Sequence, residues 1–283
     1  MIVPGSTSQS LAAALARELD EPLAPVEFDR FPDGELIVRV PVESPPGRAV
    51  IVAATTTSDA HLELLQLQDA VREAGAGEVV TVIPYMGYAR QERVTAAGEP
   101  VSARAVARAV STQTARVLTV NPHAETVLDF FDVPAFGVDA AARLADPLPD
   151  GLTDPLFLAP DEHAVDVADP VRDAYGAGTV DYLEKTRVSG DEVAIAPHTV
   201  DAAARDVVVV DDIIATGGTM SEAIRSLGAQ DANRVYAACV HPMLARSART
   251  RLARAGVEAV FGTDTIERPE SAVSVAPVLA ASL

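Results

Sequence analysis

The sequence predicts an α/β protein built from two tandem doubly wound domains with mainly parallel sheets. Short β-branched runs alternate with amphipathic segments of helical length along the whole chain, as expected when helices join parallel strands. The 283 residues fit two domains of ordinary size, and a hydrophobic content of 48% is enough for sizeable cores. A third observation is an internal repeat of strand and helix order between the two halves.

The first copy of the repeat starts at the predicted strand 49–53. The polar loop 55–58 follows, then an amphipathic helix over 61–74 and a second strand over 79–83. The second copy has the strand 207–210, the loop 211–219, the helix 220–227 and the strand 235–240. The predicted strand 117–120 of the first copy corresponds in the same way to 259–262 of the second. Because any two doubly wound domains share such an order, the repeat alone does not establish a duplication.

We place the domain boundary after residue 138, so that the predicted domains are 1–138 and 139–283. The last residues could return to the first domain. In the first domain, the loop 54–57 has neither acids nor glycines. We therefore expect the first domain to have lost the binding loop that the second one keeps.

The formal net charge is −19, from 41 acidic and 22 basic residues. This balance argues against non-specific binding to nucleic acid or to an anionic membrane, because both require a basic surface. The single cysteine, Cys239, excludes an intramolecular disulfide and fits a reducing compartment. The chain has no signal-peptide pattern and no run of about eighteen apolar residues, so we expect a cytoplasmic protein.

The basic residues include only one lysine, Lys185. An excess of acid with almost no lysine resembles the proteome of a salt-in halophile. A lysine is a compact point charge that arginine does not replace where the charge must reach a phosphate. The presence of Lys185 could equally be chance on a surface loop. The residue alone does not decide between a phosphate-binding role and no role.

The most informative segment is 207–220. Four valines predict a buried strand, with Asp211 and Asp212 where the strand would end. In open α/β sheets, ligands bind outside the carboxyl ends of the strands. A Gly-Gly pair before a helix lets backbone N–H groups approach an anion. A phosphate pocket beside two acceptor carboxylates suits a ribose 5-phosphate group, whereas the plain alternative is an acidic strand end followed by a capped helix.

Other segments also place functional groups at predicted strand ends or turns. Aromatic and acidic groups together can hold a purine, arginines can grip phosphate, and a histidine or aspartate can bind metal. Each of these segments taken alone has an ordinary structural interpretation as a turn, a solvated loop or a structural histidine. The residues are Phe31, Asp33 and Glu35; Arg90, Gln91 and Arg93; His123; Asp161; and Lys185 with Arg187.

The segment 207–220 resembles the phosphoribosyl-pyrophosphate loop that type I phosphoribosyltransferases and ribose-phosphate pyrophosphokinases share. With the other segments in this order, nearly the whole chain resembles the ribose-phosphate pyrophosphokinase family, of halophilic archaeal type. The resemblance implies two phosphoribosyltransferase-like domains. It also implies transfer of the diphosphoryl group of Mg-ATP to the C1 hydroxyl of ribose 5-phosphate, giving 5-phosphoribosyl 1-diphosphate and AMP for nucleotide biosynthesis.

The resemblance also implies a role for each segment. Mg²⁺ is the expected cofactor, and ATP and ribose 5-phosphate are the expected substrates. The chain should form a homo-oligomer, at least a dimer, because the adenine-binding segment reaches in from a neighbouring subunit. The implied roles are ribose 5-phosphate binding by Asp211, Asp212, Thr216, Gly217, Gly218 and Thr219; ATP binding by Phe31, Asp33, Glu35, Arg90, Gln91 and, more weakly, Arg93; metal binding by His123 and Asp161; and catalysis by Lys185 and Arg187.

Three departures from the family pattern leave alternatives open. Ala215 stands where many members carry an aspartate, residues 161–164 replace a turn richer in glycine, and Asn121 replaces a commoner aspartate. A non-catalytic homologue that regulates an active one is one alternative, but the phosphate loop and Lys185 speak against it. A phosphoribosyltransferase acting on a nucleobase is another, and the segment 31–35 and the two-domain length speak against that.

Overall fold

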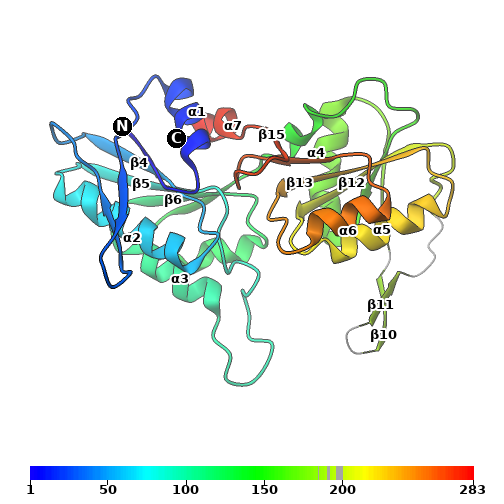
Figure 1. Ribbon diagram of the computed structural model, residues 1–283, viewed down its shortest axis with the longest axis horizontal. Coiled ribbons are helices and arrows are strands. Elements are labelled where there is room, and N and C mark those ends of the chain that lie inside the picture. Colours follow the sequence, from blue (N-terminus) through cyan, green and yellow to red (C-terminus); the bar gives the residue numbers. More distant parts are fainter. Residues whose placement is uncertain (184, 190–191, 196–199) are drawn as a thin grey trace. The chain divides into compact units, whose positions relative to one another are not determined.

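A computed structural model of the chain contains two compact units (Figure 1). Unit 1 comprises Met1–Asp139, Asp264–Glu267 and Ser274–Leu283, and unit 2 comprises Ala140–Thr263 and Arg268–Val273. The structure describes residues 1–183, 185–189, 192–195 and 200–283, and it describes no side chain between 184 and 199.

The centre of unit 1 is a parallel sheet of five strands in the order β1-β4-β5-β6-β7. An antiparallel hairpin of β2 and β3 is separate from this sheet. The strands are β1 (Ile2–Pro4), β2 (Glu27–Arg30), β3 (Leu36–Arg39), β4 (Arg48–Val52), β5 (Glu78–Ile83), β6 (Arg116–Val120) and β7 (Ala135–Val138). The helices are α1 (Gln9–Leu19), α2 (Ser58–Glu73), α3 (Ser102–Ser111), η1 (Glu125–Phe130) and, from the end of the chain, α7 (Ala276–Ser282).

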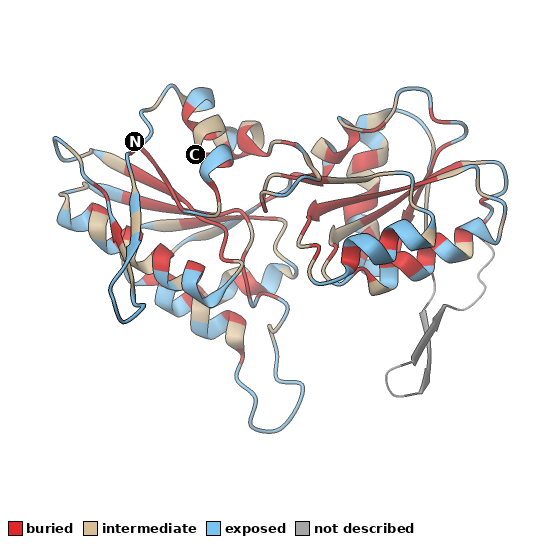
Figure 2. Cartoon of the chain, in the orientation of Figure 1, coloured by how far each residue is buried: buried red, intermediate tan, exposed pale blue. Residues whose placement is uncertain are grey.

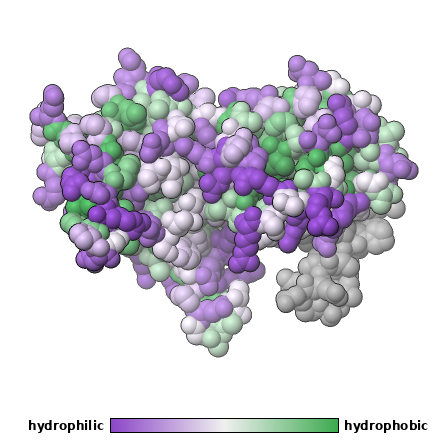
Figure 3. All heavy atoms as spheres, in the orientation of Figure 1, coloured by the Kyte–Doolittle hydropathy of each residue, from purple (hydrophilic) through white to green (hydrophobic). Residues whose placement is uncertain are grey.

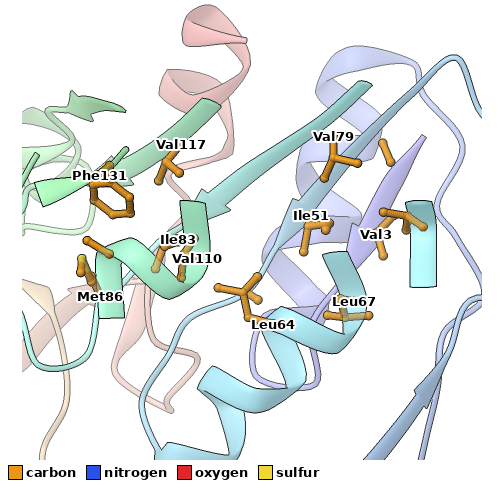
Figure 4. Packing of buried hydrophobic residues seen from close by; sticks show 14 of the residues in the cluster. Val3, Ile51, Leu64, Leu67, Val79, Ile83, Met86, Val110, Val117 and Phe131 are labelled. Carbon is orange, nitrogen blue, oxygen red and sulfur yellow. The ribbon is translucent and has the colours of Figure 1, made fainter. Parts of the chain in front are cut away.

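Apolar side chains of the strands and of α2 form the core of unit 1 (Figure 4). Val3, Ile51 and Val79 come from β1, β4 and β5, and Leu64 and Leu67 come from α2. All five are completely buried, which explains why these strands read as continuous apolar runs rather than alternating ones. Burying one such side chain contributes roughly 1.5–3 kcal/mol, so this layer is a main source of stability for the sheet.

The centre of unit 2 is a parallel sheet of six strands in the order β15-β14-β13-β12-β8-β9. Its hairpin, of β10 and β11, is likewise a separate antiparallel pair. The strands are β8 (Leu156–Ala159), β9 (Thr179–Tyr182), β10 (Lys185–Ser189), β11 (Glu192–Ile195), β12 (Asp206–Ile213), β13 (Arg234–His241), β14 (Val260–Thr263) and β15 (Ser271–Val273). The helices are η2 (Ala141–Ala145), η3 (Glu162–Ala164), α4 (Val165–Tyr175), α5 (Gly218–Gly228) and α6 (Ala248–Ala255).

The two sheets share one strand order, which confirms the predicted α/β class with mainly parallel sheets. The run β1-β4-β5-β6-β7 of unit 1 corresponds to β8-β12-β13-β14-β15 of unit 2. Cys239 lies in β13 and is fully buried, so it belongs to the core of unit 2.

One predicted boundary is wrong. β12 does not end at Val210 but continues through Asp211 and Asp212 to Ile213. The reason is its long neighbour β13, which pairs with it as far as Ile213 and His241. On its other side, β8 pairs only with Val207–Val209, so the two acids lie beyond the end of β8.

The surface of each unit is polar and the strands are buried. Figure 2 shows the buried residues concentrated along the strands and the exposed ones on the outer faces of the helices and in the loops. Hydrophilic residues spread over the visible face of both units in Figure 3, in keeping with the 41 acidic residues of the chain. Within the described ranges, no helix is long and apolar enough to cross a membrane.

Candidate functional site

The carboxyl edge of the unit 2 sheet carries the segment that the sequence singles out. Asp211 and Asp212 are half-buried near the end of β12, and the backbone N–H of Asp212 donates to Asp211 Oδ1 at 2.9 Å. Burial raises the pKa of Asp211 well above its usual range, and the charges of Asp212 and Asp161 raise it further. These three carboxyl groups therefore form one electrostatic cluster that repels additional negative charge and attracts a cation or a hydroxyl donor.

The start of α5 forms the predicted phosphate loop. Gly217 is the residue before the helix and has φ of 70°, a conformation that favours glycine, and no side chain caps the helix. The first N–H groups of a helix have no intrahelical partner and carry a partial positive charge. Thr216 and Thr219 are exposed beside them. The loop can therefore offer backbone N–H groups and two hydroxyl groups to an anion.

Asp161 lies just beyond β8, the strand next to β12. Its carboxylate accepts from the backbone N–H of Ala164 at 3.2 Å and so caps the short helix η3. The turn 161–164, which departs from the family pattern, is thus a capped 3-10 turn that leads into α4. Because β8 and β12 are parallel neighbours, Asp161 lies at the same edge of the sheet as Asp211.

Lys185 and Arg187 lie on β10, which pairs with β11 in the registers Lys185↔Ile195 and Arg187↔Val193. The segment is extended, as the prediction for these two residues requires. Their side chains are outside the described part of the structure, so their proposed role stays a prediction.

The predicted adenine-binding residues lie at the tip of the β2–β3 hairpin in unit 1. The turn is closed by the N–H of Phe31, which donates to Glu35 O at 2.9 Å, and by the N–H of Glu35, which donates to Asp33 Oδ1 at 3.2 Å. Gly34 has φ of 93°, so the turn needs a glycine. Phe31 is 47% exposed. The hairpin tip thus presents an aromatic face and two carboxyl groups to its surroundings.

Arg90, Gln91 and Arg93 follow β5 in a long connection before α3. The Oε1 atom of Gln91 accepts from the hydroxyl of Ser102, and the backbone N–H of Gln91 donates to Tyr88 O at 2.9 Å. Arg90 and Arg93 are exposed, and Arg93 forms a loose ion pair of 3.6 Å with Glu92. Gln91 is therefore fixed by the fold, whereas the arginines are accessible to an anionic ligand.

The structure also explains how this connection is held, a feature that the sequence reasoning missed. Thr55 lies just after β4 and holds the connection through two hydrogen bonds. Its Oγ1 atom accepts from the N–H of Gly87 at 2.9 Å, and the backbone N–H of Thr55 donates to Tyr85 O at 2.9 Å. A Cβ atom on Gly87 would lie 2.1 Å from Thr55 O and 2.9 Å from His61 Nε2. The one available sequence signal was the glycine within a Tyr-Met-Gly-Tyr run.

His123 follows β6 on the same edge of the unit 1 sheet and is exposed. Its neighbour Asn121 donates from Nδ2 to Asp139 Oδ1 at 2.7 Å, so this departure from the family pattern serves a local contact. His123 belongs to unit 1 and Asp161 to unit 2. Within the part of the chain that is described, no group of three or more His, Cys, Asp or Glu side chains could hold a metal ion.

Comparisons with known proteins agree with these features. Residues 1–113 match the N-terminal domain of ribose phosphate pyrophosphokinase, and residues 131–276 match the phosphoribosyl transferase domain. The chain is 62% identical over 283 residues to a ribose-phosphate pyrophosphokinase of Halobacterium salinarum, covering all of both chains. It is 47% identical to that of Methanosarcina mazei, covering all of this chain and 94% of the relative.

A solved structure extends the similarity to the whole architecture. The phosphoribosylpyrophosphate synthetase of Mycobacterium smegmatis superposes with a TM-score of 0.83 at 29% identity, covering 100% of this chain and 96% of that one. A relative from a Halobacterium also fits the halophilic character expected from the acidic, lysine-poor composition. With both family domains present in order and full-length relatives at this level of identity, the chain belongs to the ribose-phosphate pyrophosphokinase family.

Proposed function

We propose that this protein transfers the diphosphoryl group of ATP to the C1 hydroxyl of ribose 5-phosphate, giving 5-phosphoribosyl 1-diphosphate and AMP. The observation that carries the proposal is the edge of unit 2, where the uncapped start of α5 follows directly on Asp211 and Asp212. An anion site beside acceptor carboxyl groups matches a phosphorylated sugar. The family to which the chain belongs carries out this chemistry in its named members.

Ribose 5-phosphate is held, in this proposal, by two neighbouring parts of unit 2. Asp211 and Asp212 accept hydrogen bonds from the ribose hydroxyls. The 5-phosphate lies against the loop, where it accepts from the N–H groups of Gly217 and Gly218 and from hydroxyl groups. A phosphate at a helix N-terminus is favoured by both hydrogen bonding and the helix dipole. The hydroxyl donors are Thr216 and Thr219.

ATP is held by groups that belong to unit 1. Phe31 stacks on the adenine ring, and Asp33 and Glu35 accept from its exocyclic amine. Arg90 and Gln91 contact ATP, and Arg93 is a weaker candidate. Phe31 is exposed at the tip of a hairpin, which supports an adenine site completed by a second copy of the chain. We therefore propose a homo-oligomer, at least a dimer, in the cytoplasm.

Mg²⁺ is the metal that the family implies, and the donor set fits it. Mg²⁺ binds through one or two carboxylates together with substrate phosphates and retained waters, so a cage of three protein ligands is not required. The clustered carboxyl groups of Asp161, Asp211 and Asp212 repel one another in the free protein, which favours a nearby cation. Asp161 and His123 are the proposed metal-site residues. The ion would neutralise charge on the phosphate oxygens.

Lys185 and Arg187 are the proposed catalytic residues. Diphosphoryl transfer depends on positioning and on charge neutralisation, with little covalent work for the protein. A cationic pair can stabilise the charge that develops on the transferring and leaving oxygens. The backbone of β10 is extended, as this assignment requires. This role also gives the single lysine of the chain a function.

A coupled assay tests the proposed function. Purified protein in high-salt buffer is supplied with MgCl₂, ATP and ribose 5-phosphate, and AMP and phosphoribosyl pyrophosphate are measured together. Equimolar appearance of both products is the expected result. ATP that stays intact while ribose 5-phosphate binds would identify a non-catalytic member of the family. Base-dependent consumption of phosphoribosyl pyrophosphate without ATP-dependent synthesis would identify a phosphoribosyltransferase.

A further inference from the structure

A short segment after β13 fixes the phosphate loop from its far side. The N–H of Ile214 donates to His241 O at 3.2 Å, that of Leu244 donates to Ile214 O at 2.8 Å, and that of Ala245 donates to Ala215 O at 2.8 Å. The backbone leading into α6 is thus bonded to the backbone leading into α5. The two helix starts form one structural unit at the carboxyl edge of the sheet.

The first turns of α6 pack directly on the loop glycines. A Cβ atom on Gly217 would lie 3.5 Å from Ala248 and from Leu252, which are ordinary contacts. Ala248 and Leu252 are both fully buried. The position of α6 relative to the loop is therefore set by apolar packing, and the side chains on this part of α6 have a defined place beside the loop.

Arg251 is the charged residue that this packing brings to the loop. Its Nη1 atom lies 3.3 Å from the place that a Cβ on Gly218 would occupy. The side chain is exposed, and its guanidinium has no hydrogen bond or ion pair to any described residue. Arg249, two residues earlier, is instead engaged with Glu270 through two bonds of 2.6 and 2.8 Å. Arg251 thus carries an uncompensated positive charge at the first residue of α5.

The charges around the loop are mostly negative, so a cation there would favour the binding of a phosphate. Asp161, Asp211 and Asp212 lie at the same sheet edge and repel a dianionic phosphate, and the net charge of the chain is −19. Backbone N–H groups and threonine hydroxyls supply hydrogen bonds but no full charge. At molar salt the Debye length is about 3 Å, so distant charges of either sign are screened and a cation acts on the phosphate mainly when it is in direct contact. An arginine also presents a planar fork that matches a phosphate.

We propose that Arg251 is a binding residue for the 5-phosphate of ribose 5-phosphate and a determinant of specificity for the phosphorylated sugar. The proposal rests on the proposed function, because it assigns a further ligand to the same substrate site. Arg251 donates through Nη1 to a phosphate oxygen that also accepts from the loop. The sequence alone did not point to it, because Arg251 lies thirty-two residues after Thr219 and only the packing of α6 joins them.

The test compares Arg251→Gln with Arg254→Gln, an exposed arginine one turn further along α6. Steady-state kinetics give KM for each substrate, and calorimetry without ATP gives ribose 5-phosphate binding. Loss of a hydrogen bond between charged groups predicts a roughly 10- to 100-fold weaker ribose 5-phosphate interaction for Arg251→Gln. KM for ATP should change far less, and Arg254→Gln should resemble the wild type.

The outcomes separate this proposal from the proposed function. Equal ribose 5-phosphate binding by both glutamine variants would overturn the role of Arg251, even with a fully active wild type. A wild type that binds ribose 5-phosphate but forms no AMP would overturn the proposed function and leave the binding comparison intact. Arg251→Lys keeps a point charge without the planar fork, so it should fall between wild type and Arg251→Gln. Binding no better than that of Arg251→Gln would contradict the importance of the charge.

Discussion

The helices α2 and α5 occupy the same place in the two units, directly after β4 and β12, but they begin differently. At the start of α2, the side chain of Thr57 accepts from the N–H of Ala60 at 3.1 Å. At the start of α5, Gly217 has no side chain to offer. An N-cap side chain accepts a hydrogen bond from one of the free N–H groups at the start of a helix. In α2 the acceptor is part of the chain, whereas in α5 a phosphate can be the acceptor.

The space beside the first of these helix starts is also filled. Thr55 and His61 approach Gly87 so closely that a Cβ atom there would collide with both. In unit 2, the corresponding loop keeps its acids and glycines. The comparison teaches that two sheets with the same strand order can carry a filled structural support after one strand and an open loop after the corresponding strand.

Both units contain an antiparallel hairpin outside the main sheet, and the proposed roles of the two hairpins differ. Each inserts an antiparallel hairpin between two strands that are neighbours in its sheet: β2–β3 between β1 and β4, and β10–β11 between β8 and β12. The tip of the first holds Phe31, Asp33 and Glu35, and the second carries Lys185 and Arg187. In the proposed function the first hairpin recognises the base and the second acts on the transferring group.

The hairpin comparison predicts the largest effect. Lys185→Ala should lower kcat by orders of magnitude while KM for both substrates changes much less, because the proposed contact forms mainly in the transition state. Steady-state kinetics in high-salt buffer measure both parameters. Lys185→Arg keeps the charge in a different shape and should be intermediate. A wild-type kcat in Lys185→Ala would remove the catalytic role of this hairpin.

The comparison of helix starts predicts the next largest effect. Gly217→Asn places a side-chain acceptor before α5 in a residue that tolerates positive φ. KM for ribose 5-phosphate should rise roughly tenfold, the order of one hydrogen bond to a charged group. The reciprocal change, Thr57→Ala, should cost about 1 kcal/mol of unfolding free energy and leave that KM unaltered. If both variants affect KM equally, the two helix starts do not differ in function.

Asp206 and Asp211 lie on the same strand, β12, and their pKa values shift in opposite directions. Hydrogen bonds from Arg234 lower the pKa of Asp206, whereas burial raises that of Asp211. Asp206→Asn should therefore lower the unfolding free energy, because it removes the charge that accepts hydrogen bonds from the half-exposed Arg234 and from the backbone N–H of Thr153. Asp211→Asn should stabilise the free protein at neutral pH and weaken ribose 5-phosphate more than ATP.

The pH dependence of stability gives an independent check on these two acids. The contribution of Asp206 is present above the usual aspartate pKa of 3.8 and is lost as pH falls below it. That of Asp211 has the opposite sign: it is present below 3.8 and is lost as pH rises through the raised folded value. Thermal unfolding across pH measures both. Stabilities that change in the same direction in the two asparagine variants would contradict the assignment.

His61 predicts a pH dependence of stability in unit 1. Burial lowers its pKa from 6.5 to about 4, and neither ring nitrogen has a hydrogen-bond partner among the described residues. Stability should therefore fall as pH drops from 6.5 toward 4, where the unfolded chain takes up the proton first. His61→Leu should flatten the melting temperature over this interval. His163→Leu, at an exposed position, serves as the control, and an equal flattening there would contradict the explanation.

Most of the architecture could be predicted because its signals are local. The four valines 207–210 and the β-branched run 79–83 mark buried strands through their composition alone, and both ranges are fully buried. The end of β12 was misjudged because pairing with β13, not the residues Asp211 and Asp212 themselves, sets its length. A strand boundary that depends on a neighbour is not visible in one segment.

The candidate site divides in the same way. The residues 211–219 form a continuous motif, so the sequence predicts their proximity directly. The contacts of Gly87 with Thr55 and His61 form only in the tertiary fold. The spacing of these residues in the sequence does not predict them. The same holds for Asp161, whose effect on Asp211 depends on β8 lying next to β12.

The return of the last residues to unit 1 has a consequence for biosynthesis. Glu267 accepts from the N–H groups of Ser10 and Leu11 at the start of α1, and α7 packs against the same helix. The ribosome produces α1 among the first residues and these partners among the last, at about 5–20 residues per second. Unit 1 is therefore completed only after unit 2 has been synthesised. During that interval all five strands of the unit 1 sheet have been made, but α1 still lacks the cover of α7 and the acceptor Glu267.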